Sequence, residues 1–451
     1  MQSESLANPI SLTQVGQGDG VYISTYGCQM NENDSERMMT LLEMMNFRAV
    51  TSPDQASLII INSCSIREKP VHKVHSEVGR YRKLKEANPK LKIGVAGCVA
   101  QQEKQNLKLD IPLIDFVLGT DAIDHLPEVI ARVREGQPVI QARFEHQQPY
   151  HIQTMVRNPG VSTFVNITKG CDNFCTFCIV PFTRGRERSR PLEHLLKDVN
   201  ELVERGVREV TLLGQNVNSY LSECGTNFAQ LLSRLSTETG IERIRYTTSH
   251  PKDFSDELID VMNRHQDKIM EYIHLPVQSG NSEVLERMNR GYSREEYLER
   301  VRQIFARLPR AVLSTDIIVG FPGETDAQFE DTMSLLEEVP YENIFAFNYS
   351  PRPMTKAARF TDQVSDEVKS ERLTRLLARH REIAFALAKK YEGQTLKVLV
   401  ERFNSEDGRL HGRSTQNKSV YFAGPESLVG QMADVKIREA FPVTLRGEWM
   451  Q

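Results

Sequence analysis

Short apolar runs alternate with amphipathic stretches along most of this chain. In the N-terminal part, three apolar runs over positions 21–28, 58–64 and 91–98 have the character of β-strands. Apolar residues at helical spacing lie between them, over 34–45 and 71–85. Strand-like runs separated by helix-like stretches predict a parallel sheet with connecting helices. We therefore expect residues 20–135 to form a Rossmann-like parallel α/β domain.

Each of these three runs ends at a cysteine, namely Cys28, Cys64 and Cys98. Ligands of open parallel sheets collect beyond the carboxyl ends of the strands. The three thiols are therefore expected to converge on one point and to leave one metal position without a protein ligand. Spacing alone leaves open the alternative that these cysteines bind no metal. Cysteine is common as a small hydrophobic residue at buried strand ends.

From about residue 160 to 385 the alternation continues. The further strand candidates are 164–168, 210–213, 244–247, 272–275, 313–319 and 344–349. The clearest helix begins at Ser293 with Glu296 three positions on, which is a capping-box pair. Six strand–helix units favour a partial (β/α)6 barrel over half of a dinucleotide-binding fold. The preceding segment, 136–158, contains Gly and Pro turns and predicts an irregular linker.

The end of the chain predicts a long helix over 365–389 and then a small β-barrel over 390–451. Short alternating apolar runs broken by Gly and Asn are the basis for expecting a barrel. Small barrels of this kind commonly bind nucleic acid. Residues 390–451 hold 9 Lys and Arg against 8 Asp and Glu, so charge alone does not establish that role.

Cys171, Cys175 and Cys178 follow the first strand of the expected barrel with C-x3-C-x2-C spacing. Three thiolates hold three irons of a cubane cluster and leave the fourth iron open, whereas an electron-transfer ferredoxin normally adds a fourth cysteine. A structural zinc site also needs four closed ligands. The spacing therefore favours an iron–sulfur cluster that reacts at one corner, with a zinc site or buried thiols as alternatives.

Bulk properties narrow the class of protein. The 451 residues carry a formal net charge of −4, so no overall basic field points to nucleic acid. The start of the chain lacks the pattern of a secretory signal, and no apolar run approaches the roughly 18 residues of a membrane span. Seven cysteines in such a chain indicate a reducing compartment. We expect a soluble cytoplasmic protein in which Cys224 is a bystander.

The motifs around the cysteines resemble the methylthiotransferase family of radical S-adenosylmethionine (SAM) enzymes. The resemblance covers nearly the whole chain after residue 20. The segments that carry it are Tyr26-Gly-Cys-Gln-Met-Asn31, Asn62-Ser-Cys-Ser-Ile-Arg-Glu-Lys69, Gly97-Cys-Val-Ala-Gln101, Gly170-Cys-Asp-Asn-Phe-Cys-Thr-Phe-Cys-Ile-Val-Pro181, Thr183–Arg190, Leu213–Tyr220 and His274–Gly280. The chain departs from the family at Met354, where glycine is usual, and in residues 1–19, an extension without a counterpart.

The resemblance implies a methylthiotransferase domain over 20–135, a radical SAM core over 157–387 and a TRAM barrel over 390–451. It also implies two [4Fe–4S] clusters. The implied ligands are Cys28, Cys64 and Cys98 for an auxiliary cluster, and Cys171, Cys175 and Cys178 for the radical SAM cluster. Phe177 matches a position that packs near the SAM adenine. The expected SAM contacts at strand ends are Gln215, Ser249 and Gln278, and no catalytic residue is expected beyond the cluster ligands.

Among members of this family, the residues around Cys28 and Cys64 are similar to those of the enzymes that act on tRNA. The implied reaction uses two SAM molecules and converts N6-isopentenyladenosine at position 37 of tRNA to its 2-methylthio derivative. The implied partners are the anticodon stem-loop of tRNA, a reducing electron donor such as flavodoxin or ferredoxin, and a donor of sulfur or of cluster repair. We expect a monomer. Sister reactions on a ribosomal-protein aspartate or on threonylcarbamoyl-adenosine in tRNA remain alternatives, as does a non-catalytic iron–sulfur protein.

Four arginines follow the second cysteine trio within seven residues: Arg184, Arg186, Arg188 and Arg190. Charge runs are usually solvated loops. Beside an anionic substrate the size of tRNA, phosphate contact becomes the better interpretation. A second basic segment, 73–85, is equally well explained as a solvated helix face.

Overall fold

The computed structural model describes residues 15–65, 70–144, 150 and 154–450. Motif residues 66–69 and most of the N-terminal extension lie outside the described residues. The chain divides into two compact units. The first comprises the N-terminal part through residue 148 with Thr154–Arg157 and Ile179–Arg186, and the second comprises the rest. No helix among the described residues combines the length and apolarity needed to span a bilayer.

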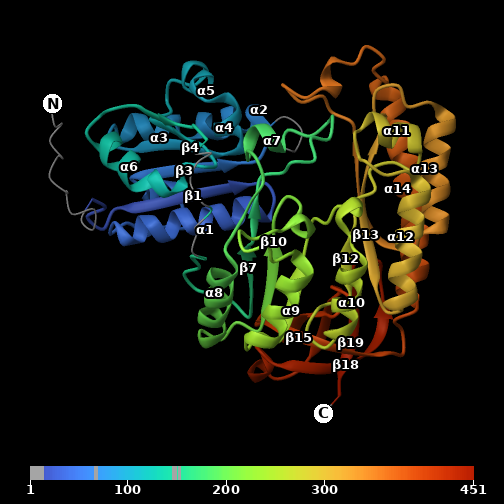
Figure 1. Ribbon diagram of the computed structural model, residues 1–451. Coiled ribbons are helices and arrows are strands. Elements are labelled where there is room, and N and C mark those ends of the chain that lie inside the picture. Colours follow the sequence, from blue (N-terminus) through green and yellow to red (C-terminus); the bar gives the residue numbers. More distant parts are fainter. Residues whose placement is uncertain (1–14, 66–69, 145–149, 151–153, 451) are drawn as a thin grey trace. The chain divides into compact units, whose positions relative to one another are not determined.

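The first unit is built on a six-stranded parallel sheet, which confirms the expected α/β fold (Figure 1). In spatial order the strands are β2 (Arg48–Ala49), β1 (Gly20–Tyr26), β3 (Leu58–Ser63), β4 (Lys92–Gly97), β5 (Phe116–Leu118) and β6 (Val139–Gln141). Every neighbouring pair is parallel. Strand β6 falls inside the expected linker, so that expectation is wrong for 139–141. A three-residue edge strand is too short to give a readable periodicity.

Helices cover both faces of this sheet because successive strand side chains point to opposite sides. Leu58 and Ile60 pack into one apolar cluster, and Ile59 and Ile61 pack into the other. The helices are α1 (Gln29–Met44), α2 (Pro70–Arg80), α3 (Arg82–Ala87), α4 (Cys98–Glu103), α5 (Gln105–Asp110), α6 (Leu126–Arg134) and the short α7 (Val180–Thr183). The sequence predicts one helix over 71–85, but the structure breaks it at Tyr81, whose side chain is buried in a core cluster.

The second unit contains the expected open barrel. Two three-stranded parallel sheets, β7-β10-β11 and β12-β13-β14, are connected through a bridge between Ile244 and Ile269. The bounds are Ser162–Asn166 (β7), Glu209–Leu213 (β10), Arg243–Tyr246 (β11), Tyr272–His274 (β12), Val312–Val319 (β13) and Tyr341–Asn348 (β14). A short antiparallel ribbon, β8 (Thr168–Lys169) and β9 (Arg188–Ser189), lies beside the cysteine loop in sequence.

Helices form the outer layer of this barrel and share one apolar core with its strands (Figure 1). They are α8 (Leu192–Glu204), α9 (Phe228–Glu238), α10 (Asp256–Arg264), α11 (Ser282–Arg287), α12 (Arg294–Arg307), α13 (Asp326–Glu338) and α14 (Asp366–Lys389). Ser293 and Glu296 form the predicted capping box at the start of α12. Ser365 caps α14, which ends where the sequence predicts.

The C-terminal segment forms a closed five-stranded barrel, as predicted. Its strands are β15 (Thr395–Asn404), β16 (Arg409–Ser414), β17 (Ser419–Ala423), β18 (Met432–Ala440) and β19 (Thr444–Trp449). Alternate residues of β15, including Val398 and Val400, fill the barrel interior with Leu410 and Val435. A closed barrel leaves no unpaired strand edge, which suits an exposed terminal domain.

Buried ionic groups join this small barrel to the starts of β10 and β11. Glu209 and Arg243 are 1 % exposed and Arg245 is 5 % exposed. Arg245 Nε lies 2.9 Å from Glu209 Oε2, and Arg243 Nη1 lies 3.7 Å from the same oxygen. Nη1 and Nη2 of both arginines donate to main-chain carbonyls of the small barrel, at Lys397, Arg413, Ser414 and Thr415. These carbonyls supply the partners that a buried ion pair requires.

We expect Arg245→Ala to destabilise the second unit by about 3 kcal/mol, because it removes the nearer of the two cations that compensate the buried Glu209 carboxylate. Urea unfolding of the full chain measures this change. Arg302→Ala is the matched control, since it removes an exposed pair with Glu299 and should change little. Equal unfolding midpoints for the two variants would contradict the structural role of Arg245.

Candidate metal centres and cofactor site

The first cysteine trio lies at the carboxyl ends of three neighbouring strands. Cys28 follows β1, Cys64 follows β3 and Cys98 follows β4. The strand order reverses between β1 and β3, and open α/β sheets bind ligands at such a switch point. The Cys64 thiol is hydrogen bonded to both other sulfurs. The structure therefore brings together the three thiols that the sequence predicts to converge.

Protonation of this trio is shared among the three sulfurs. The pKa values of Cys28 and Cys98 are lowered to about 6, first because Cys64 donates hydrogen bonds to them, and further by the positive charge of Arg184. The pKa of Cys64 is raised because its thiol is the donor. Thiolates are the form that ligates iron. Two of the three sulfurs, those of Cys28 and Cys98, therefore favour the form that ligates iron.

Asparagines from two of the motifs hold the cysteine loops together. Asn31 Nδ2 donates to Asn62 Oδ1 at 3.0 Å, and Asn62 Nδ2 donates to the carbonyl oxygen of Asn31 at 2.8 Å. Both residues are fully buried. Gly97, with φ of +87°, lies against them, and a Cβ there would be 2.3 Å from Asn62 Oδ1. The motif residues thus fix the strand ends from which the thiols project.

Arg184 is part of this site and not of an RNA-binding surface. Its side chain is 3 % exposed, and its Nη1 lies 2.8 Å from Asp34 Oδ2. The guanidinium is also hydrogen bonded to Cys98. Arg190 is likewise buried, and its Nη2 donates to Asp198 Oδ2 at 2.6 Å. The expectation of phosphate contact is therefore corrected for Arg184 and Arg190, because neither guanidinium reaches solvent in this structure.

The run of four arginines therefore has a buried residue at each end and two more exposed residues between them. Arg186 is exposed and Arg188 is partly exposed. Arg188 lies over the ring of Tyr150, with 5.8 Å between the guanidinium carbon and the ring centre. For these two residues, phosphate contact stays a prediction.

The second cysteine trio lies on a loop after β8 that three consecutive residues hold in place. Thr176 N donates to the carbonyl oxygen of Met288 at 2.9 Å, and Asn289 Nδ2 donates to the carbonyl oxygens of Asn173 and Phe174 at 3.1 Å. Arg290 Nη1 donates to Cys175 Sγ at 3.3 Å. The loop therefore depends on the segment that follows α11. The sequence gives no local signal for this contact, because it joins positions more than 100 residues apart.

Arg290 places a buried positive charge beside one of these thiols. Its side chain is 6 % exposed, and its Nη2 donates to the carbonyl oxygen of Pro276 at 2.9 Å. Burial, and to a smaller extent the neighbouring Cys175, raise the pKa of Cys171 to about 11. Iron binding displaces such protons, which makes its affinity pH-dependent. A buried arginine is therefore fixed against one of the three expected ligands.

The predicted SAM contacts lie at carboxyl ends of barrel strands. Gln215 Oε1 accepts a hydrogen bond from Gly170 N at 2.7 Å, so this residue positions the cysteine loop. Ser249 is 3 % exposed. Gln278 has φ of +77°, a conformation uncommon outside glycine, and such strain is concentrated at functional sites. SAM contact by these residues stays a prediction.

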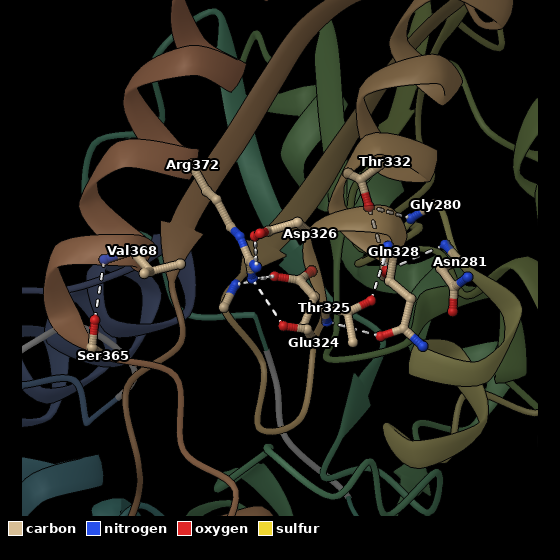
Figure 2. A network of polar contacts seen from close by, with 12 residues as sticks. Gly280, Asn281, Glu324, Thr325, Asp326, Gln328, Thr332, Ser365, Val368 and Arg372 are labelled. Atoms are coloured by element: carbon tan, nitrogen blue, oxygen red, sulfur yellow. Dashed lines mark hydrogen bonds and ion pairs between the residues drawn. The ribbon is translucent and has the colours of Figure 1, made fainter.

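Thr332 of α13, and Glu324 just before that helix, fix two of the loops beside this site (Figure 2). Thr332 Oγ1 accepts a hydrogen bond from Gly280 N at 2.9 Å, just after Gln278. Glu324 Oε2 accepts from Gly320 N at 2.6 Å and from Arg372 Nη1 at 2.8 Å. Both loops are therefore anchored through buried polar contacts, which keeps their backbone groups in fixed positions for a ligand.

Several buried polar atoms at the ends of the barrel strands have no hydrogen-bond partner among the described residues. They are Asn216 Oδ1, Ser249 Oγ, His250 Nε2, Asn348 Oδ1 and Tyr349 Oη. Buried polar atoms are normally paired, so a group of unpaired ones indicates a polar ligand. The amino, carboxylate and hydroxyl groups of SAM fit this requirement. Phe177 packs against an apolar cluster with Phe321 and Tyr349, which offers a surface for the adenine.

No group of three or more His, Cys, Asp or Glu side chains in the described part of the chain is arranged to hold a single metal ion. A cubane cluster differs from a single ion, because each cysteine binds a different iron. Cys224 is exposed, and its Sγ lies 3.1 Å from Ser222 Oγ, so it belongs to neither trio.

His250 predicts a pH dependence of stability. Burial, and then the charges of Arg290 and Lys252, lower its pKa to about 2, and its Nδ1 accepts a hydrogen bond from Lys252 N at 3.2 Å. In the unfolded chain His250 takes up a proton below about pH 6.5, whereas in the folded chain it does not. Its contribution to stability is therefore lost as pH falls below 6.5, by roughly 1 kcal/mol between pH 7.5 and 5.5.

We expect His250→Asn, which retains an acceptor, to flatten this dependence in urea unfolding at the two pH values. His194→Asn is the control, because His194 is exposed. An unchanged slope in the His250 variant would show that the histidine is protonated within the folded protein.

Comparisons with known proteins agree with this geometry. Residues 20–119 match the Uncharacterized protein family UPF0004, residues 165–336 the Radical SAM superfamily, and residues 389–450 the TRAM domain. In structure, the radical SAM methyltransferase TsrM from Kitasatospora setae aligns over 75 % of each chain with a TM-score of 0.56. At 13 % identity this is a likeness of fold alone. The Radical SAM match implies SAM and a [4Fe–4S] cluster as cofactors.

Two relatives are similar over almost their whole length. The tRNA-2-methylthio-N(6)-dimethylallyladenosine synthase of Bdellovibrio bacteriovorus is 62 % identical over 435 residues, which cover 96 % of each chain. The synthase of the same name from Moorella thermoacetica is 45 % identical over 94 % of this chain and 97 % of its own. With both cysteine trios and all three matched regions present, the chain belongs to the family of the tRNA-2-methylthio-N(6)-dimethylallyladenosine synthases, the MiaB family of radical SAM enzymes.

Proposed function

We propose that this chain transfers a methylthio group to C2 of N6-isopentenyladenosine at position 37 of tRNA. The observation that carries the proposal is the presence of two cysteine trios, each on fixed loops and each too small to close a cubane cluster. In the reaction a C–H bond of the adenine is replaced by a C–S bond, with SAM as the source of the methyl group. Adenine C2 is neither acidic nor electrophilic, so radical activation is required.

We assign the auxiliary [4Fe–4S] cluster to Cys28, Cys64 and Cys98, and the radical SAM cluster to Cys171, Cys175 and Cys178. Held by these residues, the second cluster would supply the electron for cleavage of SAM and the first would supply the sulfur. In this proposal the protein's own residues hold the cluster ligands in position. Asn31 and Asn62 hold the first set of thiols, while Gln215 and Met288–Arg290 hold the second.

We assign SAM binding to the polar atoms at the strand ends. Ser249 is itself a predicted contact, and Asn216 follows the predicted contact Gln215. Each has a buried side-chain oxygen without a hydrogen-bond partner among the described residues. Gln278 contributes a backbone held by hydrogen bonds to the main chain of Asp316 and Ile318. Phe177 provides an apolar contact for the adenine.

We assign tRNA binding to the TRAM barrel and to Arg186 and Arg188, which contact phosphates of the anticodon stem-loop. The other partners in this proposal are a flavodoxin- or ferredoxin-like electron donor and a donor that restores sulfur to the auxiliary cluster. The protein acts as a cytoplasmic monomer. Its functional parts are residues 20–135, 157–387 and 390–451.

The proposal predicts that substitutions in the two trios have different effects on two products, 5′-deoxyadenosine and the 2-methylthio nucleoside. Anaerobically reconstituted protein is incubated with SAM, dithionite and tRNA bearing isopentenyladenosine, and nucleosides are measured by mass spectrometry. Cys64→Ala should still form 5′-deoxyadenosine but no 2-methylthio nucleoside, whereas Cys175→Ala should form neither. Cys224→Ala should form both, as the wild type does.

Different outcomes would redirect the assignment. Deoxyadenosine without modified tRNA in the wild type would favour the ribosomal-protein aspartate or threonylcarbamoyl-adenosine as substrate. Neither product, with both clusters intact, would favour a non-catalytic iron–sulfur protein.

We further expect Arg186→Gln and Arg188→Gln each to weaken tRNA binding and to reduce the slope of log affinity against log salt by about 1, as loss of one phosphate contact requires. A salt titration of tRNA binding measures this slope. Arg302→Gln, on the exposed face of α12, is the control. If the salt dependence of both variants equals that of the wild type, neither arginine contacts tRNA phosphates.

A further inference from the structure

Arg184 has a buried guanidinium that the fold alone does not explain. It belongs to the first unit, although it follows the second cysteine trio in sequence. Thr120 Oγ1 donates to the carbonyl oxygen of Thr183 at 2.6 Å, which fixes the main chain beside it. Burying a guanidinium is costly unless its charge and its donors are matched. The groups around Arg184 therefore indicate which negative charge its guanidinium stabilises.

The protein partners of Arg184 satisfy it only in part. Asp34, itself 5 % exposed, provides one ion pair at 2.8 Å, and Cys98 accepts one hydrogen bond. Its Nη2 is buried without a hydrogen-bond partner in the part of the chain that the structure describes. The side chain thus has an Nη2 group without a partner, while its charge acts on the thiols of Cys98 and Cys28.

We propose that Arg184 is a positioning residue that donates to the sulfurs of the auxiliary cluster and sets its reduction potential, with Asp34 as its counter-charge. This inference rests on the proposed function, because it requires a cluster on Cys28, Cys64 and Cys98. The unused Nη2 donor is matched by the additional sulfur acceptors of such a cluster.

The electrostatic consequence has a definite sign. The potential of an iron–sulfur cluster depends on its net charge, on hydrogen bonds to its sulfurs and on its exposure. Reduction adds one electron and so one negative charge, which the fixed cation at Arg184 stabilises. Asp34 opposes part of that field, because its carboxylate lies against the guanidinium. Removing the arginine should therefore make the cluster harder to reduce, and removing the aspartate charge should make it easier.

The test isolates the auxiliary cluster in the full chain. Substituting Cys171, Cys175 and Cys178 together by Ala removes the other cluster, so that iron analysis should give four irons per chain, as one [4Fe–4S] cluster requires. The potential is then measured by redox titration followed by the electron paramagnetic resonance signal of the reduced cluster.

In this background, Arg184→Gln should lower the potential by about 59 mV, the value for a tenfold change in a one-electron equilibrium. Arg184→Lys, which keeps the charge but loses the forked donor, should give a smaller shift in the same direction. Asp34→Asn should raise the potential. Arg186→Gln, two residues away and exposed, is the matched control and should leave it unchanged.

Opposite shifts for the arginine and aspartate variants distinguish an electrostatic role from a merely structural one. Equal potentials for Arg184→Gln and Arg186→Gln, or shifts of the same sign in the Arg184 and Asp34 variants, would overturn the inference. If Arg184→Gln fails to retain iron, an unchanged potential in Asp34→Asn overturns it. Absence of iron in the parent background would instead overturn the proposed auxiliary cluster itself.

Discussion

Parallel strands end at one edge of a sheet, and both candidate metal centres depend on that constraint. In the first unit it brings Cys28, Cys64 and Cys98 together although a helix separates each from the next. In the second unit it gathers the polar ends of β10, β11 and β14 on the barrel that carries the other trio. The chemistry of this family thus relies on backbone geometry that places short loops precisely enough for cluster ligands to meet.

Each cysteine trio also has one buried arginine against a sulfur. Arg184 is held by Asp34, and Arg290 is held by the carbonyl of Pro276. Buried thiolates need a nearby cation, because removing an uncompensated charge from water is costly. The two arginines come from different parts of the chain and from different local structures. What they share is electrostatic, since each places a buried positive charge against a cysteine sulfur.

The sequence predicts the strands, the barrel, the capping box and the convergence of three thiols, because each follows from local periodicity or from strand ends. It does not predict that Arg184 and Arg190 are buried, since their partners Asp34 and Asp198 become neighbours only after folding. The role of Arg290 is hidden for the same reason. Strand β6 was missed because its three residues pair at a sheet edge that periodicity cannot show.

The contact of Arg243 and Arg245 with the small C-terminal barrel limits how this protein can be dissected. Their guanidinium groups donate to carbonyls of Lys397, Arg413, Ser414 and Thr415, all within the terminal segment. A fragment that ends after α14 would expose these groups and Glu209 together. The C-terminal barrel therefore stabilises the radical SAM core, and its own role has to be tested by changing its outer surface in the intact chain.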